Sequence, residues 1–565
     1  MTTPTTTVPG ATEYPWDDAF EKQLEGIYHA CLNQKMARAA RRQQMPVTIL
    51  YDGDYNARGR VAGEYDSKFT WRINEAGTAT ITLPEAHHLA VWALDVHGRK
   101  TENIHVIMDR DGSQWAGRMT GVEYSFLDDG TRVIVLDFLH DLAELDHVRC
   151  WPNPFSPAAA QFPKSFVLAG PAITTLKMTL ALNLYRLHGN LWQVADNPLD
   201  PVSWLEGVLP WDWTVVVEPG SIIGDSSQWC IISSRMKSFM ELARPILADA
   251  GLMITTRRWL PGQPKPKGWL APMKPGQLIV DIVDKSGVFE GTATGGTIFG
   301  GMLRTATKLA DNVIDDLVTV IASPAEPAEY TVSKWLGTAP RQPWVVFRDG
   351  QYTAIRNGKY RREPATAVTI TGGGKSAPGV NETISMTVQL VGNMIGAVFF
   401  LDTLGSIADT ALAPLYEDVF LAFGSVKSPI RAMRLGKHHY LEDWAQGMET
   451  AWALSGVVGF RQRFWETRSR ESYTIQVGDG GPYLLGAPGR GHFWLGDRIG
   501  VELKPVRGRI VVEQVQEITL AWSRDAAPGY DLTVGDPRTG QAPIARLLDQ
   551  SRLFFEAWKD LGVSK

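Results

Sequence analysis

The chain has 565 residues, enough for several domains at the usual size of about 100–200 residues each. Its composition is that of an ordinary soluble protein, with 44% hydrophobic and 21% charged residues. A net charge of -5 and a pI near 6.2 argue against a nucleic-acid-binding protein, whose surface is strongly basic. We therefore expect no stable nucleic-acid binding. The 54 glycines and 34 prolines indicate many turns, as in β-rich proteins.

The three cysteines, Cys31, Cys150 and Cys230, are odd in number and lie far apart in the sequence. No disulfide framework or metal-ligand spacing follows, so we expect reduced thiols. Residues 1–16 are rich in Thr and Pro and lack the basic and apolar regions of a signal peptide. The twenty tryptophans leave two interpretations open, namely large cores or surfaces that contact partners.

The first segment is an extended arm followed by a helix at 17–44, which Pro46 ends. From Val47 to about residue 148 the apolar residues recur at every second position, with Gly and Asp turns between short runs. This period predicts a compact barrel or sandwich of about 100 residues. The apolar residues of the helix share one stripe: Phe20, Leu24, Ile27, Cys31 and Leu32.

The rest of the chain alternates between helical and strand-like stretches. Helices are expected at 174–188, 234–250, 301–321 and 437–466, and an apolar, helix-like region at 383–423. We divide the chain into an N-terminal arm and helix (1–45), a first β-barrel (46–150), a mixed α+β insert (151–300), a helix plus β segment (301–371), an apolar, helical insert (372–471), a second β-barrel (472–540) and a C-terminal amphipathic helix (541–565).

Two distant stretches share a pattern of strand, turn, strand, Gly-containing turn and strand. One begins at Asn103 and has Val122 in its central strand; the other begins at Arg498 and has Val515 there. Two interpretations stay open: any two β-meanders align this well, or the chain contains two related barrels.

The first β region contains VTILYDGDYNARGRVAGEYDSKFTWRINEAGTATITLP, the hairpin DGSQWAGRMTGVEY and the ending DFLHDL. These stretches resemble the N-terminal barrel of siphophage tail-tip hub proteins, of which the minor tail proteins of phages infecting actinobacteria are the most similar in style. HFWLGDRIGVEL and the two strands after it are similar to the closing barrel of that family. The matched stretches cover about a third of the chain, and residues 151–300 and 372–470 depart from the small hub pattern.

The resemblance implies an α+β, β-rich multidomain fold in which two hub-type β-barrels flank mixed α/β and helical inserts. It also implies a homotrimer at the tail tip of the virion, where six barrels match the sixfold tail tube and a threefold platform faces the tip. The implied partners are a distal tail ring protein, the tape measure protein, other minor tail proteins and the host cell envelope. The implied work is host attachment and DNA ejection.

The sequence predicts no enzyme, cofactor or metal site. TITGGGKSAPG lacks a phosphate loop's first glycine, because Thr369 stands in that position. The adjacent pairs His87-His88 and His438-His439 lack metal-ligand spacing, since neighbours on a helix point about 100° apart. GxSxG is also absent. Two alternatives to a structural hub remain, a tail-associated peptidoglycan hydrolase and a receptor- or glycan-binding adhesin.

Residues 387–401 form the most apolar stretch, which is shorter than the about 20 residues needed to cross a bilayer. Either this stretch is a buried helix or trimer-axis segment, or it plugs the tail tip or contacts the host membrane. The candidate contact residues are Val391, Ile395, Val398, Phe399, Phe400 and Leu401.

Overall fold

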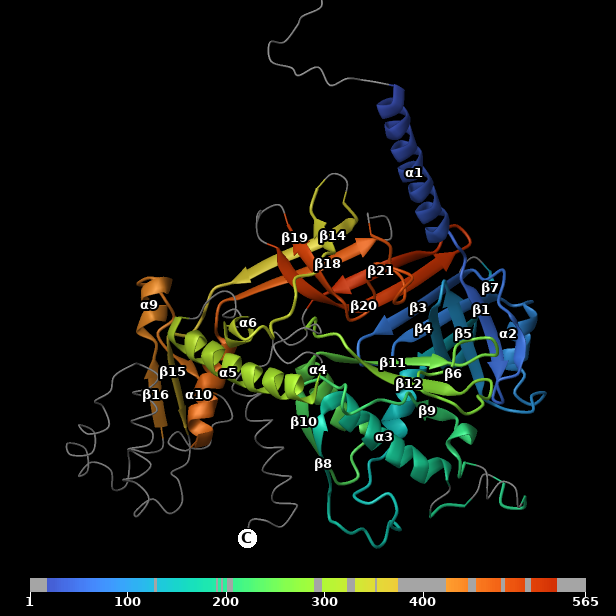
Figure 1. The fold of residues 1–565 in the computed structure, drawn as a ribbon, viewed down its shortest axis with the longest axis horizontal. Helices are drawn as coiled ribbons and strands as arrows, with labels where there is room; N and C mark the ends of the chain where they lie inside the picture. Colours follow the sequence, from blue (N-terminus) through green and yellow to red (C-terminus); the bar gives the residue numbers. More distant parts are fainter. Residues whose placement is uncertain are drawn as a thin grey trace, which may run out of the picture.

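The fold is described from a computed structural model, shown as a ribbon in Figure 1. The structure describes residues 18–126, 130–189, 192–194, 197–200, 207–288, 297–322, 331–350, 353–373, 423–445, 454–478, 483–503 and 510–535. The expectation of an α+β, sheet-rich chain is confirmed, because a large, mostly antiparallel sheet lies above a layer of helices and small sheets (Figure 1).

The first β region contains seven strands, a short helix and a 3-10 turn. β4 alternates buried and partly exposed residues, as the period of two predicts. Asp111 and Gly112 both have positive φ, 53° and 81°, the geometry of a two-residue hairpin turn between β5 and β6. The elements are β1 (Val47–Asp52), β2 (Ala57–Arg60), β3 (Asp66–Arg72), β4 (Thr78–Pro84), α2 (His88–Leu94), β5 (Ile104–Arg110), β6 (Ser113–Phe126), β7 (Arg132–His140) and η1 (Asp141–His147).

The C-terminal β region adds the other strands of the same sheet. They are β13 (Val346–Arg348), β14 (Ile355–Glu363), β18 (Arg470–Gly478), β19 (Arg498–Glu502), β20 (Val511–Ser523) and β21 (Gly529–Val534). The two stretches compared in the sequence fold as meanders, β5-β6-β7 and β19-β20-β21. Each central strand has a register shift opposite the third strand, near Met119 and near Val515.

Pairing of β3 with β20 joins the two β regions. Residues 66–72 lie antiparallel to 517–523 over seven register pairs. The main path runs β14-β18-β21-β20-β3-β4-β7-β6-β5-β1-β2, with β19 and β13 attached beside β20. This order is open, and the described strands form no closed barrel. The expectation of two separate barrels is therefore not confirmed, since β3 and β20 merge the two regions and their side chains share one core.

The insert between these regions has a core of its own. Its elements are β8 (Phe166–Pro171), α3 (Ala172–His188), η2 (Pro210–Asp212), β9 (Val215–Val217), β10 (Trp229–Ser234), α4 (Phe239–Ala250), β11 (Leu252–Arg258) and β12 (Leu278–Asp284). Helix α4 forms despite Pro245, because Ser238 and Glu241 make a capping box at its start. Gly251, with φ 67°, ends it in the left-handed conformation. Both helices expected in this part of the chain are present.

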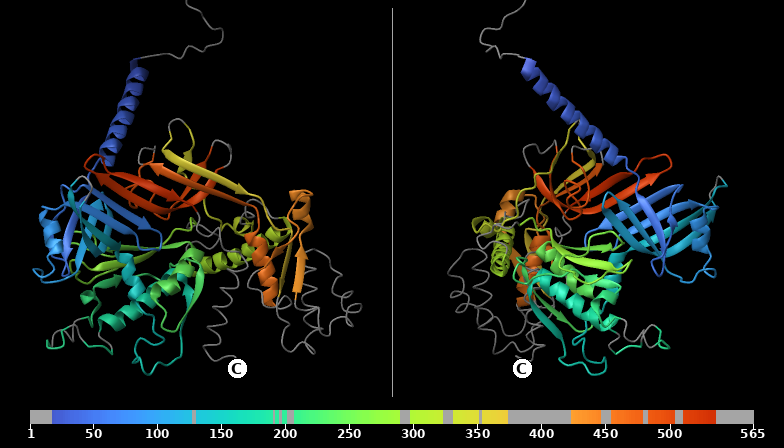
Figure 2. Two further views of the ribbon diagram at one scale, coloured as in Figure 1. Left: turned by 180° about the vertical axis from the view of Figure 1, so that it is seen from behind. Right: turned by 45° about the vertical axis from the view of Figure 1, so that its right-hand side comes forward.

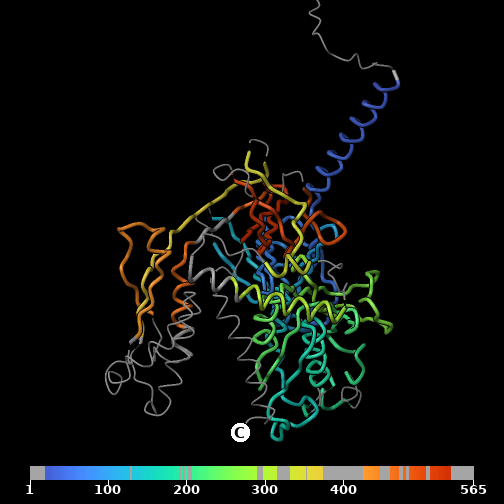
Figure 3. The backbone as a smooth tube through the Cα atoms, turned by 60° about the vertical axis from the view of Figure 1, so that its left-hand side comes forward, coloured from blue at the N-terminus to red at the C-terminus, as the bar shows by residue number. Residues whose placement is uncertain are grey.

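A third part consists of α5 (Ile298–Ala322), α6 (Thr331–Trp335), β15 (Thr369–Gly373), β16 (Phe423–Lys427), α9 (Pro429–Leu435), β17 (Asp443–Trp444) and α10 (Leu454–Glu466). Figure 3 shows β15, β16, α9 and α10 set to one side of the sheet. The long helix expected at 437–466 is wrong in its first part. Gly436, with φ 83°, ends α9, and Asp443 and Trp444 pair with β15 instead of continuing a helix. The helices expected at 383–423 and 541–565 lie outside the described residues, apart from Phe423, which begins β16.

Helix α1 (Asp18–Arg42) projects from the body in every view of Figures 1 and 2. Its last turn anchors it, through an ion pair of Arg41 with Asp111 and a hydrogen bond that Arg42 donates to the Tyr483 carbonyl at 3.2 Å. The helix is confirmed to within two residues of its expected ends.

The β3–β20 junction depends on Trp522, which is buried and stacks on Phe69 with ring centroids 5.4 Å apart. Replacement of Trp522 by Ala should lower the free energy of unfolding by about 3–5 kcal/mol, because it leaves a cavity between the two β regions. Trp335→Ala is the matched control, since Trp335 is 82% exposed and should change stability by about 0.5 kcal/mol or less. Urea unfolding measures both; equal losses in the two variants would rule out this account of the junction.

Candidate functional site

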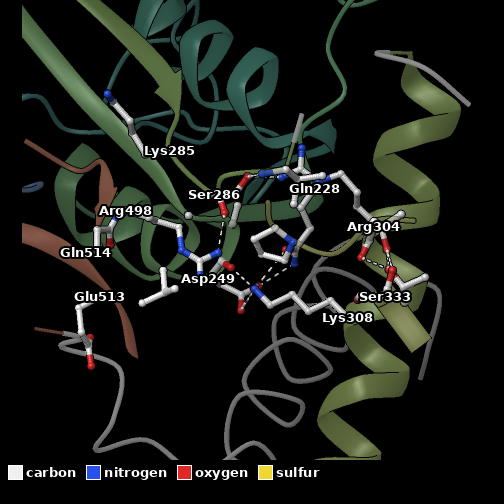
Figure 4. Close-up of a pocket in the computed structure, with 17 residues that line it drawn as sticks. Gln228, Asp249, Lys285, Ser286, Arg304, Lys308, Ser333, Arg498, Glu513 and Gln514 are labelled. Carbon is white, nitrogen blue, oxygen red and sulfur yellow. Dashed lines mark hydrogen bonds and ion pairs between the residues drawn. The ribbon is translucent and has the colours of Figure 1, made fainter. Parts of the chain in front are cut away.

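A polar cavity of about 140 Å³ lies where the sheet, the insert and α5 meet (Figure 4). Its walls come from the end of α4, the segment after β12, helices α5 and α6, and strands β19 and β20. The charged and hydroxyl side chains that matter most there are Asp249, Lys285, Ser286, Arg304, Lys308 and Arg498. The cavity is therefore a junction of three parts of the chain.

Arg304 fixes α5 to the end of β12. Its guanidinium donates to the Ser226 carbonyl and to Asp284 Oδ2, both at 2.9 Å, and to Ser286 Oγ at 2.7 Å. Because the arginine side chain is nearly buried, these bonds replace water that it has lost. These hydrogen bonds of the Arg304 guanidinium therefore set the position of α5 relative to the insert.

Lys308, one turn along α5, makes the second attachment. Its Nζ lies 2.8 Å from Asp249 Oδ1 and donates to Gln228 Oε1 at 3.2 Å. Gln228 in turn donates to Asp249 Oδ2 at 2.8 Å. This triangle links α5 to the last turn of α4 and to the residue before β10.

The sheet side of the cavity is held by two further cations. Lys285 Nζ lies 2.6 Å from Asp497 Oδ1, and Arg498 donates to the Ser286 carbonyl at 3.3 Å. Trp494 N donates to the other Asp497 oxygen at 2.7 Å. The two residues after β12 therefore contact both the sheet and α5.

Chemically, the cavity is suited to holding parts together. Its cations are bonded to carboxylates and carbonyls of neighbouring elements, so the polar groups are engaged with one another. Among the described residues there is no group of three or more His, Cys, Asp or Glu side chains that could hold a metal ion.

A second junction, centred on Arg258, joins the insert to the first β region. Arg258 Nε donates to Asp141 Oδ2 at 2.6 Å, and the guanidinium also pairs with Glu144. Gln114 of β6 bonds both to the backbone N–H of Arg258, at 2.6 Å, and to its carbonyl, at 3.1 Å. The guanidinium lies 4.9 Å from the ring centroid of Tyr55. β11 is thus attached to β6 and η1.

Burial and charge set the protonation states around Arg258. Burial raises the pKa of the Asp141 carboxyl, but the charge and the hydrogen bond of Arg258, with smaller contributions from His140 and His105, together outweigh it, so the pKa lies below its usual value. Burial also lowers the pKa of the His105 and His140 side chains, each to about 4. At neutral pH the junction therefore contains an ionised pair beside two neutral imidazoles.

The candidate residues proposed from the apolar stretch all lie outside the described residues: Val391, Ile395, Val398, Phe399, Phe400 and Leu401. Lys375 of the glycine-rich turn does too, while Thr369 begins β15.

His87 caps α2 by accepting from Leu89 N at 3.2 Å, and its ring stacks on His88. The free thiols are exposed at Cys31, buried at Cys150 and partly buried at Cys230.

The sequence interpretation missed the residues of both junctions. The available signal for Arg258 was its position on the same face of β11 as Leu252 and Ile254, which are buried. The tryptophans divide between the two interpretations left open: Trp115 and Trp522 are core residues, whereas Trp192 and Trp335 are exposed.

Arg258→Met should lower the free energy of unfolding by about 3–5 kcal/mol, because it leaves the Asp141 carboxylate buried without its cation. Arg244→Met is the control, since the Arg244–Asp146 pair is largely exposed and should contribute about 0.2–1 kcal/mol. The double variant Asp141→Leu/Arg258→Met should recover most of the loss in urea unfolding. A double variant as unstable as Arg258→Met would contradict the charge argument.

The free energy of unfolding should fall as pH drops from about 6.5 to about 4. The unfolded chain binds protons on histidine near pH 6.5, whereas the folded chain keeps His140 neutral down to about pH 4. Protons therefore favour unfolding in this window. His140→Asn keeps an acceptor for Leu142 N but does not titrate, so its stability should depend less steeply on pH. Equal slopes in urea unfolding series would refute the assignment.

Several known proteins are similar to this chain. Minor tail protein Gp28 of Mycobacterium phage L5 is 31% identical over 576 residues, covering 94% of this chain and 96% of that protein. The protein of the same name from Mycobacterium phage D29 is 31% identical over 588 residues, covering 96% and 98%.

Among solved structures, the tail protein from Neisseria meningitidis MC58 aligns with 11% identity and a TM-score of 0.34, over 88% of this chain and 99% of that one. Prophage tail protein gp18 from Listeria monocytogenes EGD-e gives 9% identity and 0.34, over 91% and 99%. These TM-scores are too low to establish a shared fold.

The family described as Siphovirus ReqiPepy6 Gp37-like protein matches residues 47–536, which include both β regions and everything between them. This chain belongs to that family.

Proposed function

We propose that the chain is a structural protein of a phage tail, and specifically a hub at the tail tip. The observation that carries the proposal is its 31% identity, over 94% of its length, to a protein named as a minor tail protein. Because the alignment covers 96% of that relative, the similarity extends over nearly all of it rather than over one shared domain. The work of such a protein is mechanical.

In the finer form of the proposal, three copies join the sixfold tail tube to a threefold tip. Two similar surfaces per chain would give a trimer six equivalent contacts. The meanders β5-β6-β7 and β19-β20-β21, each with a register shift in its central strand, support such a pair of surfaces. Their fusion through β3 and β20 would hold the two surfaces at a fixed spacing.

The proposed neighbours are a distal tail ring protein, the tape measure protein, other minor tail proteins and, at infection, the host cell envelope. The apolar residues 387–401 are proposed to plug the tip or to contact the envelope during DNA ejection. None of the described helices is long and apolar enough to cross a membrane.

A second candidate function is glycan or receptor binding. Trp192, Trp335 and Trp344 expose more than half of their side-chain surface, and exposed aromatic rings are suited to contacts with partners. Under this alternative the chain would bind host cells as an isolated protein.

Native mass spectrometry of the purified full-length chain tests the hub. The expected mass is three times 62.4 kDa, because the hub interface should form without other tail proteins. Two further assays of the same purified chain test the alternatives: incubation with host cells for the adhesin, and a peptidoglycan zymogram for the hydrolase. A stable monomer would contradict the proposed trimer. Tight binding of that monomer to host cells would favour the adhesin. Clearing of the zymogram would favour a hydrolase.

A further inference from the structure

Helix α1 presents side chains to solvent along most of its length. Every described side chain from Ala19 to Ala37 is exposed, and Arg38 is the first that is partly covered. The exposed set includes large apolar residues: Leu24, Ile27, Tyr28, Leu32 and Met36. Figures 1–3 show the helix pointing away from the rest of the chain. The apolar side chains of α1 are therefore not part of a described core.

A projecting helix of this kind is incomplete by itself. Its 25 residues give it a length of about 38 Å. Isolated helices are marginal in water, and most helical stability in proteins comes from packing of an apolar face. Tyr28 is 64% exposed and Met36 is 63% exposed, so this face is available to another molecule.

The exposed surface of α1 is ordered along its length. At about 100° per residue, Leu24, Tyr28 and Leu32 fall within one narrow stripe. Towards the C-terminus Lys35 and Arg42 continue the same stripe, and Arg38 borders it. Glu21 precedes Leu24 in this stripe. From Leu24 onwards, a partner lying along α1 would meet apolar side chains first and then cationic ones.

The body extends the cationic part of this stripe. Arg38, Arg41 and Arg42 of α1 lie near His492, whose pKa is lowered by burial and then by these three charges. Arg110 donates to the Arg42 carbonyl and stands 4.7 Å from the ring centroid of Tyr530. Arg490 lies 3.8 Å from Asp111, the carboxylate that also pairs with Arg41. Arg110 itself is buried, and we call the other four arginines the arginine collar: Arg38, Arg41, Arg42 and Arg490.

The collar is positive in a chain whose net charge is -5. Two of its members, Arg41 and Arg490, both pair with Asp111, and their side chains are 33% and 65% exposed, so carboxylates of a partner can reach them. Charge complementarity therefore favours a partner that brings carboxylates to the base of α1.

From these surfaces we propose that α1 and the arginine collar form a docking site for an amphipathic helix of another tail protein. The apolar face of that helix lies on Leu24, Tyr28 and Leu32, and its Asp or Glu side chains lie on the collar. This inference rests on the proposed function, in which the chain is built into a tail.

A second copy of the chain fits this site less well. Threefold symmetry would set the α1 helices in parallel around the axis, so that Lys35 and Arg38 of each copy face like charges. A twofold antiparallel pair would instead join two bodies end to end, which does not close a threefold ring. The occupant is therefore a different chain.

Photo-crosslinking in assembled particles tests the site. The full-length chain with Tyr28→p-benzoylphenylalanine is supplied during infection alongside wild-type copies, so that particles assemble, and Ala30 carries the probe in the control because it lies on the opposite face. The expected Tyr28 crosslink is to a different virion protein, within an amphipathic segment that contains carboxylates. Its yield should exceed that of the Ala30 probe at least tenfold.

A charge series adds a second readout. Lys35→Glu with Arg38→Glu, in the chain that carries the Tyr28 probe, should reduce the crosslink at least tenfold, because the carboxylates of the partner then face like charges. Lys22→Glu lies off the stripe and should leave the yield unchanged.

The failures of the two proposals can be told apart. Absence of the chain from purified particles would contradict the tail function itself. If the chain is present, the docking site is refuted by a Tyr28 crosslink to a second copy, by a yield no higher than at Ala30, or by an unchanged yield in the charge-reversed variant.

Discussion

The pairing of β3 with β20 is the constraint on which the rest of the structure depends. It brings residues 66–72 against 517–523, so the chain between them is held at both ends by one sheet. Closing so long a loop has an entropic cost that grows only slowly with its length. The buried stack of Phe69 on Trp522 and the edge contact of Phe69 with Trp115 offset this cost with apolar area. A large insert can therefore be accommodated without separating the two β regions.

Two polar junctions then fix the insert against this sheet. One is the pair Arg258–Asp141, which links β11 to the first β region, and the other is the cavity around Arg304 and Lys285, which links α5 and β12 to the second. Buried ion pairs add little net stability, since desolvation opposes the attraction between the charges, but an unpaired member is costly. Such junctions therefore favour one arrangement of the parts, as the proposed hub would require.

The sequence predicted the individual helices and strands better than the way in which they pack together. The period of two located β3 to β7, and the helix expected at 234–250 is observed as α4, which begins five residues later, at Phe239. The merged sheet could not be predicted, because strand patterns specify which face of a strand is buried but not which distant strand it pairs with. The junctions were missed for a related reason: Arg258 and Arg304 resemble surface residues until the fold places a carboxylate beside each. The helix expected at 437–466 is wrong at Asp443 and Trp444, because these residues pair with strand β15 instead.

The structure is a platform made of one sheet with two similar meanders, an insert held by buried charges, and a projecting helix. In a phage tail, such a platform would connect neighbours of different symmetry. The most direct measurement is a cryo-EM reconstruction of the tail of the particle that contains this chain. From the proposed hub we expect three copies around the tail axis at the tip, each with β3 paired to β20. Six copies, a position away from the tip, or β regions separated within one chain would contradict it.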